Sequence, residues 1–223
     1  MLEKGLNMHD ENTKIFFGID KRHSSWDKLR KVSKIIMFGR LLYGGSDRGI
    51  YTQVMTAVPD CGLTFTKFKE AVRNYFDAHP EFALWCREVQ ELARRESISV
   101  NAFGRVRTLL GSSDATSRQA LNSPIQGSAA DVVRDDIIDI RREFRKKELK
   151  AKIILAVHDE IIFEVPKNEL SVVWPIVKSV MNRVRHVNGH DFRIPIDAEI
   201  GTFWGDMGSF DEKTFKRTGG SKH

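Results

Sequence analysis

The chain has 223 residues, with 36 Lys or Arg against 30 Asp or Glu, and a formal net charge of +6. This length suits one large domain or two small ones, and the basic balance is compatible with a polyanionic partner. No apolar run approaches the ~18 residues of a membrane span, and no signal peptide is visible, so we expect no membrane association. The two cysteines, Cys61 and Cys86, are too few for a disulfide framework and indicate a reducing compartment, the cytoplasm.

The first half of the chain predicts a helical region that ends in a short β-hairpin. The expected elements are a weakly patterned segment over 1–26 attached through Phe16 and Phe17, a helix from Asp27 to Gly44-Gly45, two helices within 65–95 divided at His79-Pro80, and a strand, turn and strand over 97–111. In the last of these, Arg105 and Arg107 alternate with Val106, which places both arginines on one side of the expected sheet.

Three side chains of the first long helix recur at steps of four residues: Arg30, Lys34 and Phe38. This spacing places them along one helix face, each about one turn above the last. Two cations above an aromatic ring can hold a triphosphate and the flat part of a nucleotide. The alternative is an ordinary solvated flank, because amphipathic helices commonly carry Lys and Arg at their edges.

The second half begins with a long, interrupted helical segment over 117–147, in which Arg118, Asn122 and Gln126 also step by four. Whether these three share a face depends on how far the chain kinks at Pro124. The run from Ser123 to Gln126 has the form of a capping box. Further on, we expect a helix over 170–187, a strand over 192–203 and a disordered polar tail over 208–223.

Between these helices, the stretch AKIILAVHDEIIFEVP predicts a β-hairpin over 152–165. Two short β-branched runs flank His158, Asp159 and Glu160 at the expected tip. Adjacent carboxylates on a rigid hairpin suit Mg²⁺, which binds through one or two carboxylates and leaves its other positions to water and phosphates. Taken alone, the stretch favours a plain polar turn, because Asp and polar neighbours are common in turns.

Four motifs then follow one another in a characteristic order. They are Arg30-x3-Lys34-x3-Phe38-Gly39 with Tyr43-Gly44, FGRVR, Arg118-x3-Asn122-x-Pro124-x-Gln126-Gly127-x-Ala129-Ala130-Asp131, and Val157-His158-Asp159-Glu160. Together they strongly resemble the C-terminal half of the family A DNA polymerases. The resemblance implies an α+β fold: a mostly helical fingers subdomain over 27–115, and over 116–207 part of an antiparallel palm sheet that carries the catalytic hairpin.

The resemblance implies a metal site on the hairpin. Asp159 corresponds to the palm carboxylate that binds two catalytic Mg²⁺ ions, Glu160 to its less critical neighbour, and His158 to a residue near the primer end. The reaction would be two-metal phosphoryl transfer, in which dNTPs are added to a primer 3′-hydroxyl.

The resemblance also implies nucleotide and DNA contacts in the fingers and on the long helix. Arg30 and Lys34 correspond to residues that grip the incoming triphosphate, with Lys34 also placed in the catalytic set. Phe38 corresponds to the ring packed against the nucleotide sugar, where Phe in place of Tyr accompanies discrimination against dideoxynucleotides. Primer-template DNA would be contacted by Arg118, Asn122, Gln126, Arg105 and Arg107.

The sequence departs from the family pattern in two places. The first is at Tyr43, which the resemblance places at the nucleotide and template position. The interval from Lys34 to Tyr43 is one residue longer than the family's usual interval, so Leu42 stands where the tyrosine is expected. An extra residue late in a helix can be absorbed as a π-bulge.

The second departure is larger. Family A enzymes hold their metals between two aspartates, and the first lies in a motif like DYSxIELR that this sequence lacks. The start of the chain, over 1–26, resembles the segment just after that motif, with His9 in the place of a family histidine. We therefore expect this chain to be the second part of a split polymerase. A phage origin would place it in the host cytoplasm. A second polypeptide would supply the first aspartate, the thumb and an exonuclease, and this chain would be inactive alone. The alternative is a non-catalytic remnant that binds DNA or protein.

Overall fold

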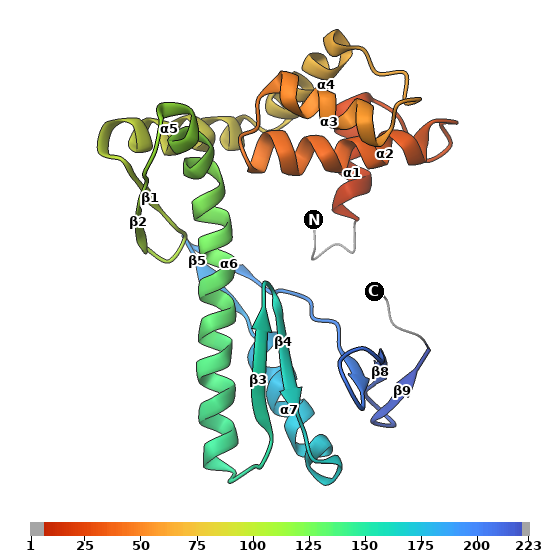
Figure 1. Ribbon diagram of the computed structural model, residues 1–223, viewed down its shortest axis with the longest axis vertical. Helices are drawn as coiled ribbons and strands as arrows, with labels where there is room; N and C mark the ends of the chain where they lie inside the picture. Colours follow the sequence, from red (N-terminus) through yellow and green to blue (C-terminus); the bar gives the residue numbers. More distant parts are fainter. Residues whose placement is uncertain (1–6, 220–223) are drawn as a thin grey trace. The chain divides into compact units, whose positions relative to one another are not determined.

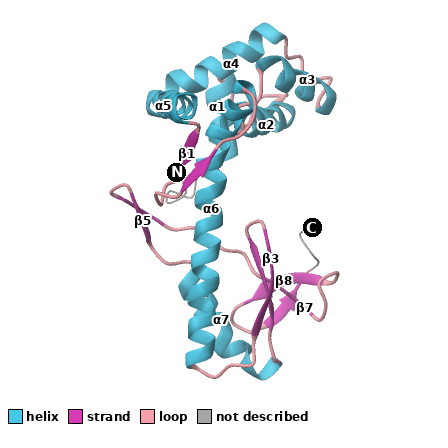
Figure 2. Ribbon diagram, turned by 60° about the vertical axis from the view of Figure 1, so that its left-hand side comes forward, coloured by secondary structure: helices cyan, strands magenta, loops and turns pink. Residues whose placement is uncertain are grey.

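The computed structural model describes residues 7–219, apart from the side chains of residues 113 and 114. Contacts divide the chain into two compact units, Met1–Gly127 (unit 1) and Ser128–His223 (unit 2). Helices dominate unit 1, and short antiparallel sheets account for much of unit 2 (Figure 2). The expected α+β class is therefore confirmed. Within the described residues, no helix is both long and apolar enough to cross a membrane.

Unit 1 is built mainly from helices whose starts are set by local capping. Its elements are α1 (Met8–Phe17), α2 (Trp26–Ile35), the π-helix η2 (Ile36–Leu42), α3 (Asp47–Ala57), α4 (Phe65–Ala78), α5 (Pro80–Glu96), β1 (Ile98–Val100), β2 (Val106–Thr108) and the first part of α6 (Ser113–Lys146). Side chains of Asn7, Ser46 and Thr64 accept hydrogen bonds from the first turns of α1, α3 and α4. Pro80 begins α5, where its missing N–H costs nothing, so the predicted division at His79-Pro80 is confirmed.

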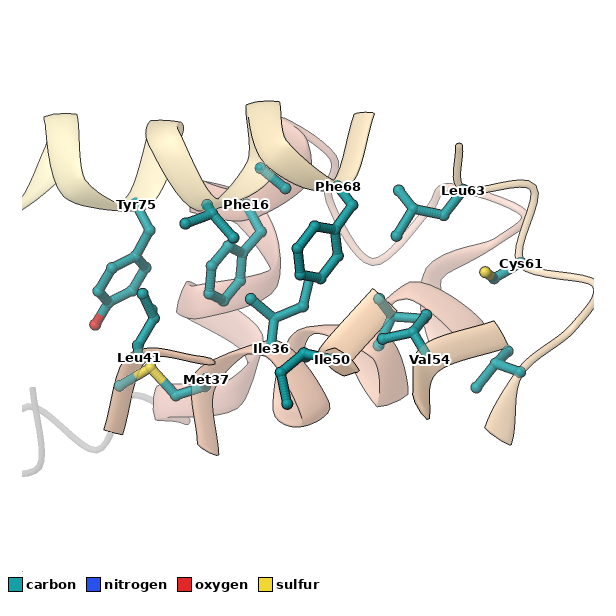
Figure 3. Packing of buried hydrophobic residues seen from close by; sticks show 14 residues of the cluster. Phe16, Ile36, Met37, Leu41, Ile50, Val54, Cys61, Leu63, Phe68 and Tyr75 are labelled. Carbon is teal, nitrogen blue, oxygen red and sulfur yellow. The ribbon is translucent and has the colours of Figure 1, made fainter. Parts of the chain in front are cut away.

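One apolar cluster holds the helices of unit 1 together. Phe16 from α1, Ile36 from η2 and Phe68 from α4 are each at most 1% exposed and point into the same core (Figure 3). The ring of Phe16 also stacks on Tyr75, with 5.0 Å between ring centroids. The expectation that Phe16 attaches the first segment to a larger body is confirmed, and Phe17 packs against the edge of the same cluster.

Helix α6 corrects one local prediction. A capping box would begin a helix at Ser123, but Pro124 lies inside a continuous helix that begins ten residues earlier. The Ser123 hydroxyl instead accepts a hydrogen bond from Arg107 Nη1 at 2.8 Å. The capping pattern fails because a long-range partner, absent from the local sequence, takes the side chain that would have capped the helix.

Unit 2 is a helical pair covered by short strands. It contains the second part of α6, β3 (Lys152–Val157), β4 (Glu160–Glu164), the 3₁₀ turn η3 (Lys167–Glu169), α7 (Leu170–Met181), β5 (Arg185–Val187), β6 (His190–Phe192), β7 (Glu199–Gly201), β8 (Met207–Asp211) and β9 (Lys216–Thr218). The β3–β4 hairpin lies beside α6 and α7 (Figure 1). Its residues Ile153 and Phe163 pack in one apolar cluster with Phe144 of α6 and Val173 of α7. The predicted hairpin is confirmed.

The end of unit 2 differs from two expectations. The helix predicted over 170–187 stops at Met181, because Arg185 is withdrawn into a buried ion pair with Asp136 of α6 and begins β5. The strand predicted over 192–203 is only partly formed, since β6 and β7 occupy its two ends.

The disordered tail predicted over 208–223 is wrong for residues 208–219. There β8 and β9 pair with each other, and β8 also pairs with β7. The ring of Phe210 packs on Trp174 of α7, with 5.1 Å between centroids, and Glu212 forms an ion pair with Lys178. This packing on α7 supplies the apolar contacts that composition alone did not reveal. Residues 220–223 lie outside the described part of the chain.

Candidate active site

The predicted nucleotide-facing residues lie on α2 and η2. Arg30 is a quarter exposed, and its Nε donates to Asp10 Oδ1 of α1 at 2.5 Å, while Nη2 donates to Asn7 Oδ1 at 3.3 Å. Lys34 and Phe38 follow along the helix and line one shallow groove of about 550 Å³. Phe38 is 40% exposed there, which is unusual for a phenylalanine and leaves one side of its ring accessible to a ligand.

The extra residue between Lys34 and Tyr43 is absorbed as a π-helix. η2 spans seven residues, and the Tyr43 N–H donates to the Phe38 carbonyl oxygen, five residues back, at 2.9 Å. The expected π-bulge is confirmed. Tyr43 remains on the groove, with its ring centroid 6.4 Å from that of Phe38. The bulge therefore keeps Lys34, Phe38 and Tyr43 on one surface despite the longer spacing.

Helix α6 meets the end of η2. Gly44 has φ +66°, and a Cβ on it would lie 3.2 Å from Arg118 Cα. Because α6 runs unbroken past Pro124, Arg118, Asn122 and Gln126 succeed one another at four-residue steps of one helix. Gln126 Nε2 donates to Tyr43 Oη at 3.3 Å. Asn122 is half-buried, and its Oδ1 is a buried atom with no hydrogen-bond partner among the described residues.

The two arginines of the β1–β2 hairpin lie against α6. Arg105 Nη2 donates to the Gly127 carbonyl oxygen at 3.1 Å, and Arg107 Nη1 donates to Ser123 Oγ at 2.8 Å. Their placement on one side of the hairpin is confirmed. Both guanidinium groups hold the hairpin to the helix that carries Gln126, so they support that helix whatever else they bind.

The hairpin of unit 2 presents His158, Asp159 and Glu160 at its tip, all exposed. Val157 pairs with Glu160 across the strands, so the connecting turn is only His158-Asp159. His158 has φ +53°, a conformation that costs a non-glycine residue free energy. Among the described residues, Asp159 makes no hydrogen bond or ion pair. A turn this tight holds the Asp159 backbone firmly while its carboxylate faces solvent.

The oxygen donors of the tip fit Mg²⁺ in part. Within residues 7–219, no three His, Cys, Asp or Glu side chains gather in a metal-binding group. Mg²⁺ commonly needs only one or two carboxylates, because water and substrate phosphates complete its coordination. Asp159 and Glu160 therefore match the one or two carboxylates that such a site takes from protein.

Two neighbours of the nucleotide face lie on the first turn of α1: His9, which the sequence analysis named only for its family-like position, and Asp10, which it did not name. The His9 ring meets Phe38 edge-on, with 5.9 Å between centroids. Burial and the charges of Lys34 and Arg30 lower the pKa of His9. Hydrogen bonds from Lys21 and Arg30 lower the pKa of Asp10. Only the family-like position of His9 pointed this way, because the ion pair joins residues 20 positions apart.

Comparison with known proteins agrees with these features. Residues 1–206 match the family model "DNA polymerase family A". The chain is 30% identical over 213 residues to DNA polymerase I of Bacillus subtilis (strain 168), covering 92% of this chain and 23% of the relative. It is 28% identical over 214 residues to DNA polymerase I of Chloroflexus aurantiacus, covering 92% of this chain and 21% of the relative. The chain thus spans less than a quarter of these relatives' lengths.

A solved structure shows the same fold. It is the POL domain of Pol1 from M. smegmatis in complex with DNA primer-template and dNTP, with a TM-score of 0.68 and 29% identity, over 80% of this chain and 31% of that one. The family match covers nearly the whole chain, and the structural match covers four-fifths of it. This chain belongs to DNA polymerase family A.

Proposed function

We propose that this chain forms the fingers and part of the palm of a template-directed DNA polymerase that adds dNTPs to a primer 3′-hydroxyl. The observation that carries the proposal is the groove of unit 1. Lys34, Phe38 and Tyr43 line it, and Tyr43 is hydrogen-bonded to Gln126 of α6. A cation, two accessible rings and an amide together offer phosphate, sugar and base contacts on one surface.

Arg30, one turn of α2 before the groove, and Lys34, which lines it, bind the triphosphate of the incoming dNTP, and Phe38 packs on its sugar. Tyr43 marks the template position, where the π-helix keeps it beside Phe38. Arg118, Asn122 and Gln126 contact primer and template; they follow one another at four-residue steps of α6, and Gln126 reaches Tyr43 on the groove. Arg105 and Arg107 add positive charge beside the same helix.

The hairpin tip supplies the other half of the chemistry. Asp159, with Glu160 beside it, holds a share of two Mg²⁺ ions, and His158 lies near the primer end. When bound, the ions would activate the primer hydroxyl and neutralise charge on the triphosphate and pyrophosphate. The chain's own contribution is to fix Asp159 on a two-residue turn and to align the nucleotide through Arg30 and Lys34.

A second polypeptide completes this site. No motif like DYSxIELR, which holds the family's first metal aspartate, lies in the sequence. The two-stranded β3–β4 sheet exposes Ile154 by 56% and Leu155 by 39%, and such a surface is suited to being covered by a further palm segment. We propose that the second polypeptide carries that aspartate, the thumb and an exonuclease, and that this chain alone has negligible activity.

Reconstitution tests the proposal. The chain is mixed with the product of a neighbouring reading frame that carries the missing motif, and primer extension is measured with Mg²⁺. We expect extension only from the mixture, and its loss in Asp159→Ala. The matched control is Glu164→Ala at the far end of β4, also exposed, which should remain active.

Two results would contradict the proposal. Robust extension by the purified chain alone would remove the need for a partner. Extension that survives Asp159→Ala would remove the metal role of the hairpin. DNA binding by the chain with no extension from any mixture would favour the non-catalytic remnant.

A further inference from the structure

The strongest unassigned feature is a buried carboxylate behind the proposed triphosphate site. Asp10 of α1 is 7% exposed, and it bridges two cations: Oδ1 accepts from Arg30 Nε at 2.5 Å, and Oδ2 lies 2.6 Å from Lys21 Nζ. We propose that Asp10 is a positioning residue that orients the Arg30 guanidinium toward the triphosphate of the incoming nucleotide. This inference rests on the proposed function of Arg30.

The geometry at Arg30 leaves its binding end available. Asp10 takes the Nε of the guanidinium, the nitrogen nearest the main chain. Of the two terminal nitrogens, Nη2 makes one long contact of 3.3 Å with Asn7 Oδ1, and Nη1 has no hydrogen bond to a described residue. An arginine held through Nε keeps the planar pair of terminal donors for a phosphate oxygen pair.

Asp10 is held by a rigid element. One turn further along α1, Thr13 Oγ1 and Ser33 Oγ of α2 lie 2.8 Å apart in a buried hydrogen bond. A second turn along, Phe16 is buried in the core of unit 1. Because α1 is fixed to α2 at these two points, the Asp10 carboxylate has a defined position from which to orient Arg30.

Two opposing effects decide whether Asp10 raises or lowers the affinity for the triphosphate. A carboxylate near a triphosphate repels it. Against this, a free arginine loses rotamer entropy when it is ordered on a ligand. Lys21 offsets the charge of Asp10, so the group Asp10, Lys21 and Arg30 keeps a net positive charge. Preorganisation therefore outweighs repulsion, and Asp10 increases triphosphate affinity.

The test measures binding of inorganic tripolyphosphate to the full chain by titration calorimetry. We expect Asp10→Asn to weaken binding by about ten- to hundredfold, the range for loss of a charge-assisted hydrogen bond. Asp10→Glu, which keeps the charge, should restore most of the affinity. The matched control is Glu11→Gln on the same turn, whose carboxylate pairs with Lys14 and should leave binding unchanged.

A double-mutant cycle separates positioning from a general structural effect. If Asp10 acts through Arg30, then Asp10→Asn has no further effect on affinity when Arg30→Ala is already present. A circular dichroism melt of each variant checks folding. Where the amide at this buried position prevents folding, Asp10→Ser repeats the measurement with a small side chain suited to a first helical turn.

The outcomes separate the nucleotide site at Arg30 from the positioning role of Asp10. Unchanged tripolyphosphate affinity in Arg30→Ala would overturn the proposed nucleotide site itself. Weaker binding in Arg30→Ala, with unchanged or tighter binding in Asp10→Asn, would leave that site standing and overturn only the positioning role of Asp10. A loss in Asp10→Asn that persists in the Arg30→Ala background would also overturn it.

Discussion

Gln126 Nε2 donates to Tyr43 Oη at 3.3 Å, which joins two residues 83 positions apart in the chain. The bond links the end of η2 to α6, and the next residue after the tyrosine, Gly44, lies against α6, since a Cβ on it would be 3.2 Å from Arg118 Cα. The position of Tyr43 on the groove therefore depends on the close approach of Gly44 to α6.

Substitution of Gly44 tests how much the close contact with α6 contributes to stability. In Gly44→Ala, the added Cβ would meet Arg118 Cα at 3.2 Å, and φ is +66°. The matched control is Gly62→Ala, where φ is +68° and nothing lies within 4 Å of the Cβ. We expect the control to lose about 1 kcal/mol of unfolding free energy from the left-handed backbone alone, and Gly44→Ala to lose about 1–3 kcal/mol more from crowding. Equal losses in urea denaturation would show that the contact has no energetic weight.

The turn of the β3–β4 hairpin stores strain at His158, whose φ is +53°. His158→Gly relieves that strain and should raise the free energy of unfolding by roughly 0.5–1 kcal/mol, after the entropic cost of glycine. In the same turn, Asp159 does not have positive φ, so Asp159→Gly should lower stability by about 0.5–1 kcal/mol. Chemical denaturation of both variants checks this pair. A stability loss in His158→Gly would mean that the imidazole makes a contribution larger than the strain.

A buried ion pair anchors the β5–β6 hairpin. Both carboxylate oxygens of Asp136 accept from Arg185 Nη2, at 2.9 and 2.7 Å, and the two side chains are 3% and 7% exposed. Asp136→Ala leaves a buried guanidinium uncompensated and should cost about 3–5 kcal/mol, whereas replacing both residues with Leu and Met should cost far less. The exposed pair Glu143 and Lys146 is the control, and Glu143→Ala should cost at most about 1 kcal/mol. Denaturation midpoints of the three variants measure their order of stability. The prediction is wrong if the double variant is the least stable.

The lowered pKa of His9 makes stability depend on pH. Burial and the nearby charges of Lys34 and Arg30 disfavour the protonated ring in the folded state, although Asp10 opposes them. The unfolded chain therefore takes up the proton first as pH falls below about 6.5, so the stabilisation present above that pH is lost toward acid. We expect the unfolding free energy of His9→Gln to fall less steeply between pH 6.5 and 5 than that of the wild type. His190→Gln, on an exposed hairpin, should keep the wild-type slope.

The accessible ring of Phe38 predicts nucleotide selectivity in the reconstituted enzyme. Adding a hydroxyl in Phe38→Tyr provides a polar group beside the sugar that substitutes for a missing 3′-hydroxyl. We expect dideoxynucleotide incorporation relative to dNTP to rise on the order of tenfold or more, equivalent to ~1.4 kcal/mol. Tyr43→Phe, on the same groove, should leave that ratio unchanged. Competition assays with paired substrates measure it directly, and an unchanged ratio in Phe38→Tyr would remove Phe38 from the sugar position.

The local sequence was sufficient for features that depend on near neighbours. Helical periodicity predicted α2, α4 and α5, and the β-branched runs predicted the β3–β4 hairpin. The order of the motifs identified the family. Arg30 and Phe38 could be assigned to one helix face from their spacing, and Asp159 to a turn from the two strands around it. The longer interval before Tyr43 even predicted a π-bulge, since a helix has few other ways to absorb one residue.

Tertiary structure decided what depends on distant partners. Ser123 does not cap a helix because Arg107 takes its hydroxyl, and the helix after Leu170 ends early because Arg185 is drawn to Asp136. Residues 208–219 form strands because Phe210 packs on Trp174. The carboxylate behind Arg30 comes from another helix. Each of these contacts joins segments that no local pattern relates, since burial and charge pairing act through space and helix periodicity acts along the chain.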